Sequence, residues 1–517
     1  MTRAGAAALL AVALTAGLAL RLTRLDVRPM HHDEANQAVK FGALLEGGEY
    51  RYDAHDHHGP TLYYLALPAA WIRGQRTLAS LDEGTLRGVT AVFGAATILL
   101  LPLAAAGIGR TAAAAGAILM ALSPAMVFYS RMFIQESLFA FFSLGFVIGA
   151  GQAVTRGGRS WFTMAGVAGG LAIATKETSL IVLPAAVLAC AIAWRSLRSH
   201  VARRPLNGIS LRTGLFLTVT TAAVVAALFY SSFFAAPAGV LEPLRAAAIY
   251  LDRGAAPASH SHPWHYYGGL ITYSYSGGVT WTEGLVVLLG VVGMVEAWSG
   301  RADHLRRFWA RYLSGFVAIT VVIFSAIPYK TPWNLLPFHA GLLVLAGVGF
   351  SALVHARAPR VLRWAMVVAF VAAAGHLGWQ AWRASVTYAS DPRNPYVYAQ
   401  TVPDAVRMSI RIRELAMMHP DRARMQVSVI APPYEQWPIP WYLRSMPNVG
   451  YWTAAGDQLA HQAPVIVAST DHTAALDRVL GDRYVSEFYG LRPEVVLSLY
   501  IERGLWERFL ADRAAAP

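Results

Sequence analysis

Two carboxylates stand in a polar stretch shortly after the first long apolar run of the chain, in MHHDEANQAVK, residues 30–40. A carboxylate such as that of Asp33 or Glu34 can take a proton from an acceptor hydroxyl or amine, as a general base does. An ordinary solvated loop can also hold such a pair. Charged residues at a membrane boundary that face the protein are costly, however, and usually functional. The pair is therefore a candidate for catalysis.

Further charges stand at the ends of apolar runs in three short stretches, SPAMVFYSRMFIQESLFAFF (123–142), ATKETSL (174–180) and FSAIPYKTPWNLLPFH (324–339). The charged residues in them are Arg131, Glu136, Lys176, Glu177 and Lys330. Each could simply mark the membrane edge, where long cationic side chains extend toward the headgroups. A lysine close to an aromatic residue such as Trp333 could instead hold a leaving phosphate, whose charge grows in the transition state.

The composition places these residues in a membrane protein. The chain has 517 residues, is 56% hydrophobic and 14% charged, and has a mean hydropathy of +0.41, which is typical of a polytopic membrane protein and excludes an ordinary soluble enzyme. The formal net charge of +13 comes largely from short loops between apolar runs, so we predict no nucleic-acid binding. Cys190 is the single cysteine, which excludes an intramolecular disulfide.

The apolar runs predict about eleven membrane-spanning helices, because one span needs about 20 mostly apolar residues. The runs cover residues 4–20, 86–106, 112–129, 137–154, 161–175, 178–194, 213–235, 284–298, 312–328, 334–354 and 362–381. The first run could be a cleaved signal peptide. No clear small-residue cleavage site precedes Arg21, however, which favours a retained anchor.

The charges of the loops predict which side of the membrane each loop faces. Basic residues are concentrated in loops 195–212 and 300–311 and in two shorter loops, which the positive-inside rule places in the cytoplasm. The long loops 21–85 and 236–283 and the tail would then face outwards, together with the charges described above. Because no nucleotide triphosphate is expected outside, an activated donor would be carried in the membrane. A lipid-linked sugar phosphate fits this requirement.

The tail predicts a separate soluble domain. Three of its stretches have the pattern of short buried strands: MQVSVIA (425–431), PVIVAS (464–469) and EVVLSLYI (494–501). Helix-like stretches at 401–418 and 472–480 alternate with them, as is typical of a small α/β domain. We therefore predict a mainly α protein, with a polytopic membrane helix bundle over residues 1–382 and an external α/β domain over residues 383–517.

Four elements in this order resemble those of the GT-C glycosyltransferase superfamily, in particular its protein O-mannosyltransferase and aminoarabinose-transferase branch. Within that branch the chain looks most similar to the flippase activity-associated proteins. The elements are HHDEANQAVK, HHGPTLYYL, SRMFIQESLFAFF and PYKTPWNLLPFH, and the resemblance covers roughly residues 1–380. The stretch TKET matches the family more loosely, and His58 stands where many relatives have a lysine.

The resemblance implies an inverting sugar transfer from a polyprenyl-phosphate-linked donor to a lipid, glycan or protein acceptor at the outer face of the cytoplasmic membrane. It implies that Asp33 is the catalytic base with Glu34 as its neighbour, and that Glu136 helps to position the acceptor. The leaving phosphate would be held by Lys330 together with Arg131. The other residues expected to bind substrate are Lys176, Glu177, His58, Tyr63, Trp333 and His262.

The histidines of the first long loop leave two interpretations open. The residues concerned are His31, His32, His55, His57 and His58, with Asp33 and Asp56. Imidazole and carboxylate are common metal ligands, so these residues could bind a divalent metal ion. The interpretation we favour is that they bond to substrate or shape the loop, so no cofactor is assigned. His262 belongs to a second cluster, SHSHPWHYYGG (259–269), which could stack on a sugar or isoprenoid or form an interfacial aromatic belt.

Two alternatives to an enzyme use the same residues. One is a lipid-linked sugar flippase or flippase accessory without catalysis, and the other is a silent binding module. Transport predicts polar groups spread through the depth of the membrane. Here the ionisable residues cluster at the predicted outer boundary and the spans are nearly free of charge, which favours an enzyme.

Overall fold

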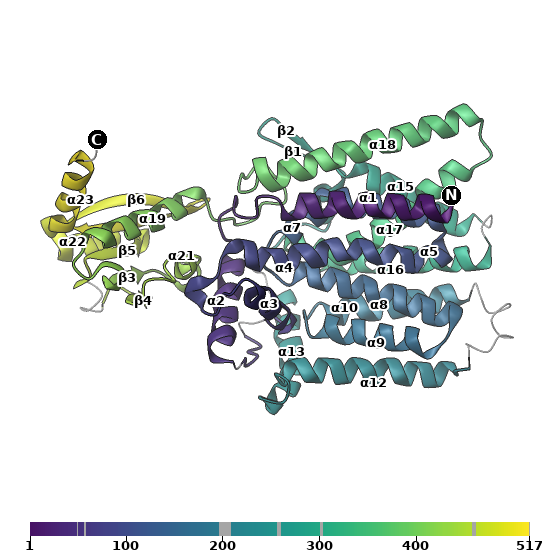
Figure 1. The fold of residues 1–517 in the computed structure, drawn as a ribbon, viewed down its shortest axis with the longest axis horizontal. Coiled ribbons are helices and arrows are strands. Elements are labelled where there is room, and N and C mark those ends of the chain that lie inside the picture. The colour runs from purple at the N-terminus through teal and green to yellow at the C-terminus, as the bar shows by residue number, and fades with distance from the viewer. Residues whose placement is uncertain are drawn as a thin grey trace. The chain divides into compact units, whose positions relative to one another are not determined.

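The structure is a computed structural model that describes residues 1–48, 50–55, 58–195, 208–255, 260–299, 303–456 and 462–515, without the side chains of 251–255. Its described part is mostly helical, with a small sheet near the C-terminus (Figure 1). The chain divides into two compact units. The membrane unit comprises Met1–Leu25, Gly48–Ala69 and Gly84–Tyr398, and the tail unit comprises Asp26–Gly47, Ala70–Glu83 and Ala399–Pro517.

Each of the eleven apolar runs coincides with a helix or a pair of consecutive helices. They are α1 (Arg3–Leu22), α4 and α5 (Glu83–Ala96 and Leu101–Ile108), α6 and α7 (Arg110–Leu122 and Pro124–Ser130), α8 (Glu136–Arg156), α9 (Arg159–Ile173), α10 (Ser179–Trp194), α12 (Leu211–Tyr230), α15 (Gly284–Trp298), α16 (His304–Ala326), α17 (Leu336–His355) and α18 (Arg360–Trp382). In the described part, seven helices are long and apolar enough to cross a membrane, or eight if the bent pair α6 and α7 is one span. The predicted polytopic helix bundle is therefore confirmed.

Small residues let these helices approach closely. α15 packs against α17, and α17 against α6. A Cβ added at Gly349 of α17 would lie 1.9 Å from the carbonyl oxygen of Leu289 on α15, and one added at Gly347 would lie 2.3 Å from that of Ala112 on α6. Such contacts matter in a membrane, where packing rather than water exclusion drives helix association.

Short elements connect the helices at the end of the bundle where α8 begins and α9 ends. Within the membrane unit these elements include α13 (Glu242–Ala255), α14 (Tyr266–Thr272), the hairpin of β1 (Ser274–Ser276) and β2 (Val279–Trp281), and the 3₁₀ turn η4 (Pro332–Leu335). Helix α3 (Thr61–Ile72) follows the first long loop. The predicted functional residues of the membrane unit lie in or next to connections of this kind.

The tail unit is built around a five-stranded sheet of order β4-β3-β5-β7-β6. Its elements are α19 (Pro403–Met418), β3 (Val427–Ile430), α20 (Pro433–Gln436), α21 (Ile439–Tyr442), β4 (Val449–Trp452), β5 (Val465–Ser469), α22 (Thr470–Leu480), β6 (Tyr484–Arg492), β7 (Val495–Glu502) and α23 (Arg503–Ala515). β3 is parallel to β4 and β5, and β7 is antiparallel to β5 and β6. The predicted α/β domain is confirmed, and β3, β5 and β7 are its three predicted strands.

Two strands of the sheet were not predicted. β4 is four residues long and has no buried residue, and the nine residues of β6 are mostly partly buried, with Leu491 alone fully buried. Both lie at the edges of the sheet. An edge strand with one wet face has no continuous apolar run, which is the signal on which the other three strands depend.

Part of the first long loop belongs to the tail unit. Helix α2 (His32–Gly47) lies in this unit, and the segment that precedes it is bonded to residues far along the chain. The main-chain N–H of Met30 donates to the Tyr442 hydroxyl at 2.7 Å, and Gln400 Nε2 donates to the carbonyl oxygen of Pro29 at 2.9 Å. The sequence analysis assigns the whole loop to the membrane domain of residues 1–382. In the structure, two stretches of the loop, Asp26–Gly47 and Ala70–Glu83, belong to the same compact unit as the tail.

Replacing Gly349 by alanine is expected to destabilise the contact between α15 and α17. The added methyl group has no room beside Leu289, and overpacking of this kind typically costs about 1–3 kcal/mol. Gly375 on α18 is the matched control, because a Cβ there would meet no described heavy atom within 4 Å. The thermal unfolding midpoint of the purified protein in detergent should fall for Gly349→Ala and not for Gly375→Ala. An equal fall in both variants would contradict the close approach.

Candidate active site

A buried ion pair joins three connections of the membrane unit. The ammonium of Lys176, just after α9, donates to Oε1 of Glu136, the first residue of α8, and to Oδ1 of Asn334 in η4 at 2.9 Å. The side chains of Lys176 and Glu136 are 5% and 4% exposed. The structure therefore brings together two of the predicted site residues and adds Asn334, which the sequence did not single out.

A second polar group lies around the neighbouring residue, Glu177. Its carboxylate accepts from the Tyr52 hydroxyl at 3.1 Å and lies 2.8 Å from Nδ1 of His58, which is also 3.0 Å from the Tyr250 hydroxyl. Burial alone would raise the pKa of Glu177, but the His58 ring and its hydrogen bond outweigh burial and lower that pKa. The ring of Tyr63, another predicted site residue, packs on that of Tyr50, with the ring centroids 4.8 Å apart.

Lys330 is buried without a carboxylate partner among the described residues. The residue is 1% exposed, and its ammonium donates to the carbonyl oxygens of His262 at 2.9 Å and Ile327 at 2.5 Å. Burial lowers the pKa of Lys330. An ammonium carries three N–H donors, and two of them bond to main-chain oxygens. Among the described residues, the positive charge of Lys330 is therefore buried and compensated by two carbonyl dipoles.

Aromatic rings surround the Lys330 loop. The ring of His262 stacks on that of Tyr266, with centroids 4.1 Å apart and planes 16° apart. The Trp333 ring meets those of Tyr129 and Tyr398 edge-on, at 6.2 and 5.9 Å. The structure therefore places both predicted aromatic partners, Trp333 and His262, in the two segments that meet at Lys330.

Arg131 donates to several main-chain carbonyl oxygens. Its guanidinium donates to the carbonyl oxygens of Leu20 at 2.9 Å, Thr23 at 2.6 Å and Arg24 at 2.8 Å, at the C-terminal end of α1. The last carbonyl groups of a helix have no partner within the helix. Arg131 supplies such partners, so the structure gives it a clear role in fixing the end of α1.

Asp33 and Glu34 start helix α2 in the tail unit, where they have different environments. Glu34 is fully buried, and its Oε2 accepts from the main-chain N–H of His31 at 3.0 Å and lies 3.8 Å from an Arg28 nitrogen. A glutamate that reaches back in this way to the residue before the helix satisfies one main-chain N–H at the helix start, as in one half of a capping box. The Asp33 side chain is 41% exposed, so this carboxylate is accessible to a substrate.

The histidines do not form a metal site in the described residues. No group of three or more His, Cys, Asp or Glu side chains there is placed to hold a metal ion. His57 and Asp56 lie outside the described residues. Nδ1 of His31 lies 3.8 Å from Oδ2 of Asp33 and accepts from the main-chain N–H of Asp33 at 3.1 Å. Burial lowers the pKa of the neighbouring His32.

Glu283 is a buried residue that the sequence analysis missed. Its carboxylate accepts from the Ser123 hydroxyl at 2.7 Å, the Ala125 main-chain N–H at 2.9 Å and the Tyr396 hydroxyl at 3.0 Å, and it lies 3.0 Å from His339 Nε2. This carboxylate links α7, α15 and α17 to the segment after α18. A single glutamate before an apolar run was the only sequence signal.

A family model matches one stretch of the chain, which is less than half of its length. Residues 12–236 match the family described as dolichyl-phosphate-mannose-protein mannosyltransferase. Among functionally curated proteins, none matches the sequence.

Solved structures share the fold over nearly the whole chain. The crystal structure of ArnT from Cupriavidus metallidurans, bound to undecaprenyl phosphate, has a TM-score of 0.64 at 17% identity, and the match covers 96% of this chain and 98% of that one. The archaeal oligosaccharyltransferase AglB from Archaeoglobus fulgidus, in complex with an inhibitory peptide and a dolichol phosphate, has a TM-score of 0.59 at 14% identity, with 97% and 77% covered.

The solved structures confirm the predicted fold class, and the family matched by residues 12–236 agrees with the predicted class of enzyme. The chain is a multi-pass membrane protein with the fold of the GT-C glycosyltransferases, and the family that residues 12–236 match is one of glycosyltransferases. These findings do not bear on the narrower resemblance to the flippase activity-associated group.

Replacing Lys176 by methionine is expected to destabilise the protein strongly. It leaves the Glu136 carboxylate buried without its ammonium, and breaking a buried pair from one side costs about 3–5 kcal/mol. The double variant Lys176→Met/Glu136→Leu leaves no charge behind and should regain much of that loss. Unfolding midpoints in detergent compare the two variants with the wild type. A double variant less stable than Lys176→Met would contradict a desolvated pair.

Proposed function

We propose that this GT-C glycosyltransferase takes its sugar from a polyprenyl-phosphate-linked donor and that Lys330 binds the phosphate that leaves. The observation that carries the proposal is the buried ammonium of Lys330, which bonds to two carbonyl oxygens and has no carboxylate beside it in the described residues. A buried cation of this kind gains most from an anionic ligand. The lipid phosphates bound in the ArnT and AglB structures support the same class of donor.

Asp33 is the proposed general base. The acceptor hydroxyl or amine gives its proton to the Asp33 carboxylate while the acceptor atom attacks the anomeric carbon of the sugar. The bond between that carbon and the phosphate oxygen breaks, and polyprenyl phosphate leaves with the bonding electrons. One such displacement inverts the anomeric configuration. Glu34 is then a positioning residue, because its carboxylate holds the first turn of α2 and thereby orients Asp33.

The buried pairs of the membrane unit have supporting roles in this proposal. Lys176 and Glu136 fix η4, which directly follows Lys330 and Thr331. Preorganised charges stabilise a transition state more effectively than mobile ones, since they need no reorganisation during the reaction. The His58 and Glu177 side chains, with their tyrosine neighbours, are of the type that bonds sugar hydroxyls.

The arginines support an external location for this chemistry. The end of the membrane unit opposite Lys330 carries most of the loop arginines, including Arg156, Arg159, Arg306, Arg307, Arg357 and Arg360. The positive-inside rule places that end in the cytoplasm. We therefore place Lys330 at the outer face of the cytoplasmic membrane, where a lipid-borne donor and a lipid, glycan or protein acceptor can be reached.

Asp33→Asn is expected to abolish sugar transfer while leaving the protein folded, because the Asp33 side chain is partly exposed. Loss of a general base typically costs about 10²–10⁴-fold in rate. Glu34→Gln should instead lower the unfolding midpoint and reduce turnover less, because a neutral amide can still accept the His31 N–H. The measurement is release of polyprenyl phosphate from a panel of lipid-linked sugars in nanodiscs. Wild-type release that persists in Asp33→Asn would exclude this base, and movement of intact donor without release would favour a flippase.

The rate is expected to fall on the alkaline side through loss of the Lys330 charge. Burial lowers the pKa of Lys330, so its ammonium is lost at a lower pH than that of an ordinary lysine. The kcat/KM for donor should therefore be highest below that pKa and decline as pH rises through it. Lys330→Arg keeps a charge to above about pH 12 and should flatten the decline. A wild-type profile that Lys330→Arg does not change would contradict phosphate binding by Lys330.

A further inference from the structure

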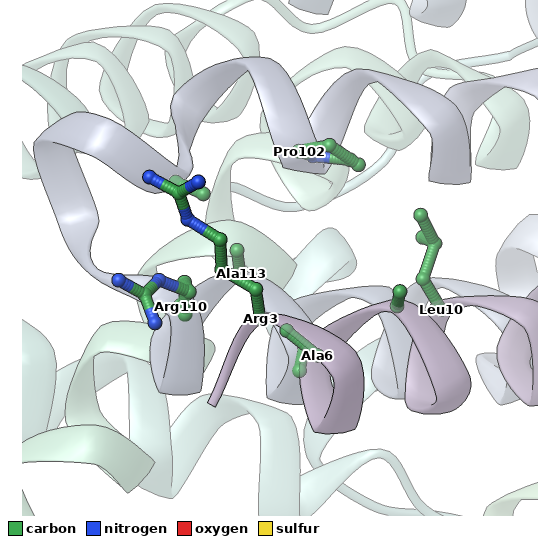
Figure 2. Close-up of a pocket in the computed structure, with 9 residues that line it drawn as sticks. Arg3, Ala6, Leu10, Pro102, Arg110 and Ala113 are labelled. Atoms are coloured by element: carbon green, nitrogen blue, oxygen red, sulfur yellow. The ribbon is translucent and has the colours of Figure 1, made fainter. Parts of the chain in front are cut away.

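A crevice opens between α1, α5 and α6, far from the candidate active site (Figure 2). Arg3, the first residue of α1, is one of the residues that line the crevice. The opposite end of α1 is the end whose carbonyl groups bond to Arg131. Because α1 has 20 residues, these two ends are about 30 Å apart. The crevice is therefore a separate feature of the membrane unit.

The wall of the crevice is apolar. Ala6 and Leu10 of α1 face Pro102 of α5 and Ala113 of α6 around a cavity of about 230 Å³. The small side chains on α1 and α6 create the space, since alanine leaves room where a larger residue would fill it. The helices around it are membrane-spanning segments. Hydrocarbon rather than water is the medium that fits such a wall.

Two arginines border the crevice at one end. In Figure 2 the side chains of Arg3 and Arg110 both lie at one end of the crevice, with Leu10 and Pro102 farther along it. Both arginines are exposed, and no described carboxylate pairs with either of them. Arg110 donates to the Met1 carbonyl oxygen at 2.9 Å. Two like charges placed together repel each other, so an anion between them would be stabilised.

The backbone adds to this positive potential. Helices α1 and α6 both begin here, at Arg3 and Arg110, and the N-terminus of a helix carries a partial positive charge. Gly109, the residue before α6, has no side chain to accept from the first N–H groups of that helix. An anion at this place would meet two guanidinium groups and the N-terminus of α6, whereas the Thr2 hydroxyl already caps that of α1.

We propose that the crevice binds one anionic phospholipid, with its phosphate between Arg3 and Arg110 and part of an acyl chain along Leu10 and Pro102. A guanidinium bonds a phosphate in a two-pronged way, and basic pockets between spans suit anionic headgroups. A zwitterionic lipid brings its own ammonium, which the arginines repel. A free phosphate has the charge but no chain for the apolar wall. The site does not depend on the proposed sugar transfer.

The test uses the full chain, purified and stripped of lipid in detergent. Phosphatidylglycerol and phosphatidylcholine with identical acyl chains are titrated separately, and bound lipid is counted by native mass spectrometry. The wild type should bind phosphatidylglycerol more tightly. Each arginine near a membrane surface contributes about fivefold to the affinity for an anionic lipid, so Arg3→Gln/Arg110→Gln should lose about 25-fold. Its affinity for phosphatidylcholine should not change.

Two further variants separate a site from general surface charge. Arg357→Gln/Arg360→Gln removes the same charge from exposed residues at the same end of the bundle and should keep the tight binding. Ala6→Phe fills the crevice but keeps both arginines, and it should weaken phosphatidylglycerol binding. Glycerol phosphate should not compete. Equal losses in the two double variants, or full binding in Ala6→Phe, would overturn the proposal.

Discussion

The cost of burying charged groups away from water is the constraint on which this structure depends. In the membrane unit the Lys176 ammonium is buried together with Glu136, and the Glu283 carboxylate together with His339. Removing the Lys176 ammonium would leave the Glu136 carboxylate buried without its counter-charge, which is costly away from water. These pairs therefore hold the helix ends where they are. Lys330 differs from them, because carbonyl oxygens are its only described partners, and the proposal that it binds the leaving phosphate rests on this difference.

Much of the fold could be predicted because both the long apolar runs of the spans and the short apolar runs of the buried strands can be recognised locally in the sequence. A run of apolar residues long enough to cross a bilayer is visible in any window, and each such run became a helix. In the tail, β3 and β5 are buried along their whole lengths and produced the same kind of signal. β4 and β6 lie at the sheet edges, where most of their residues are only partly buried, and they produced none. The membership of α2 in the tail unit was not predictable, because it depends on contacts with residues about 400 positions away.

The candidate site was predictable as a set of positions and less so as a set of roles. Charges at the ends of apolar runs correctly indicated that Lys176 and Glu136 lie in connections of the bundle. What a side chain does depends on what it touches, which spacing cannot show. Arg131 fits the expected pattern, yet its donors bond to the carbonyl groups of α1. Asp33 and Glu34 are adjacent in sequence, but successive residues of a helix point about 100° apart, so one is exposed and the other caps the helix.

The membrane unit presents positive charge at both ends, in forms suited to different anions. Lys330 is buried and fixed by main-chain oxygens, so an anion bound there meets a charge that does not need to move. Such a site can stabilise charge that develops during a reaction. Arg3 and Arg110 are exposed on flexible side chains beside an apolar crevice. Solvent screens the charge of these exposed side chains, and the side chains can change conformation. Both properties suit the binding of a lipid headgroup that does not react. This difference in burial is the reason why the two proposals assign chemistry to Lys330 and lipid retention to the arginines.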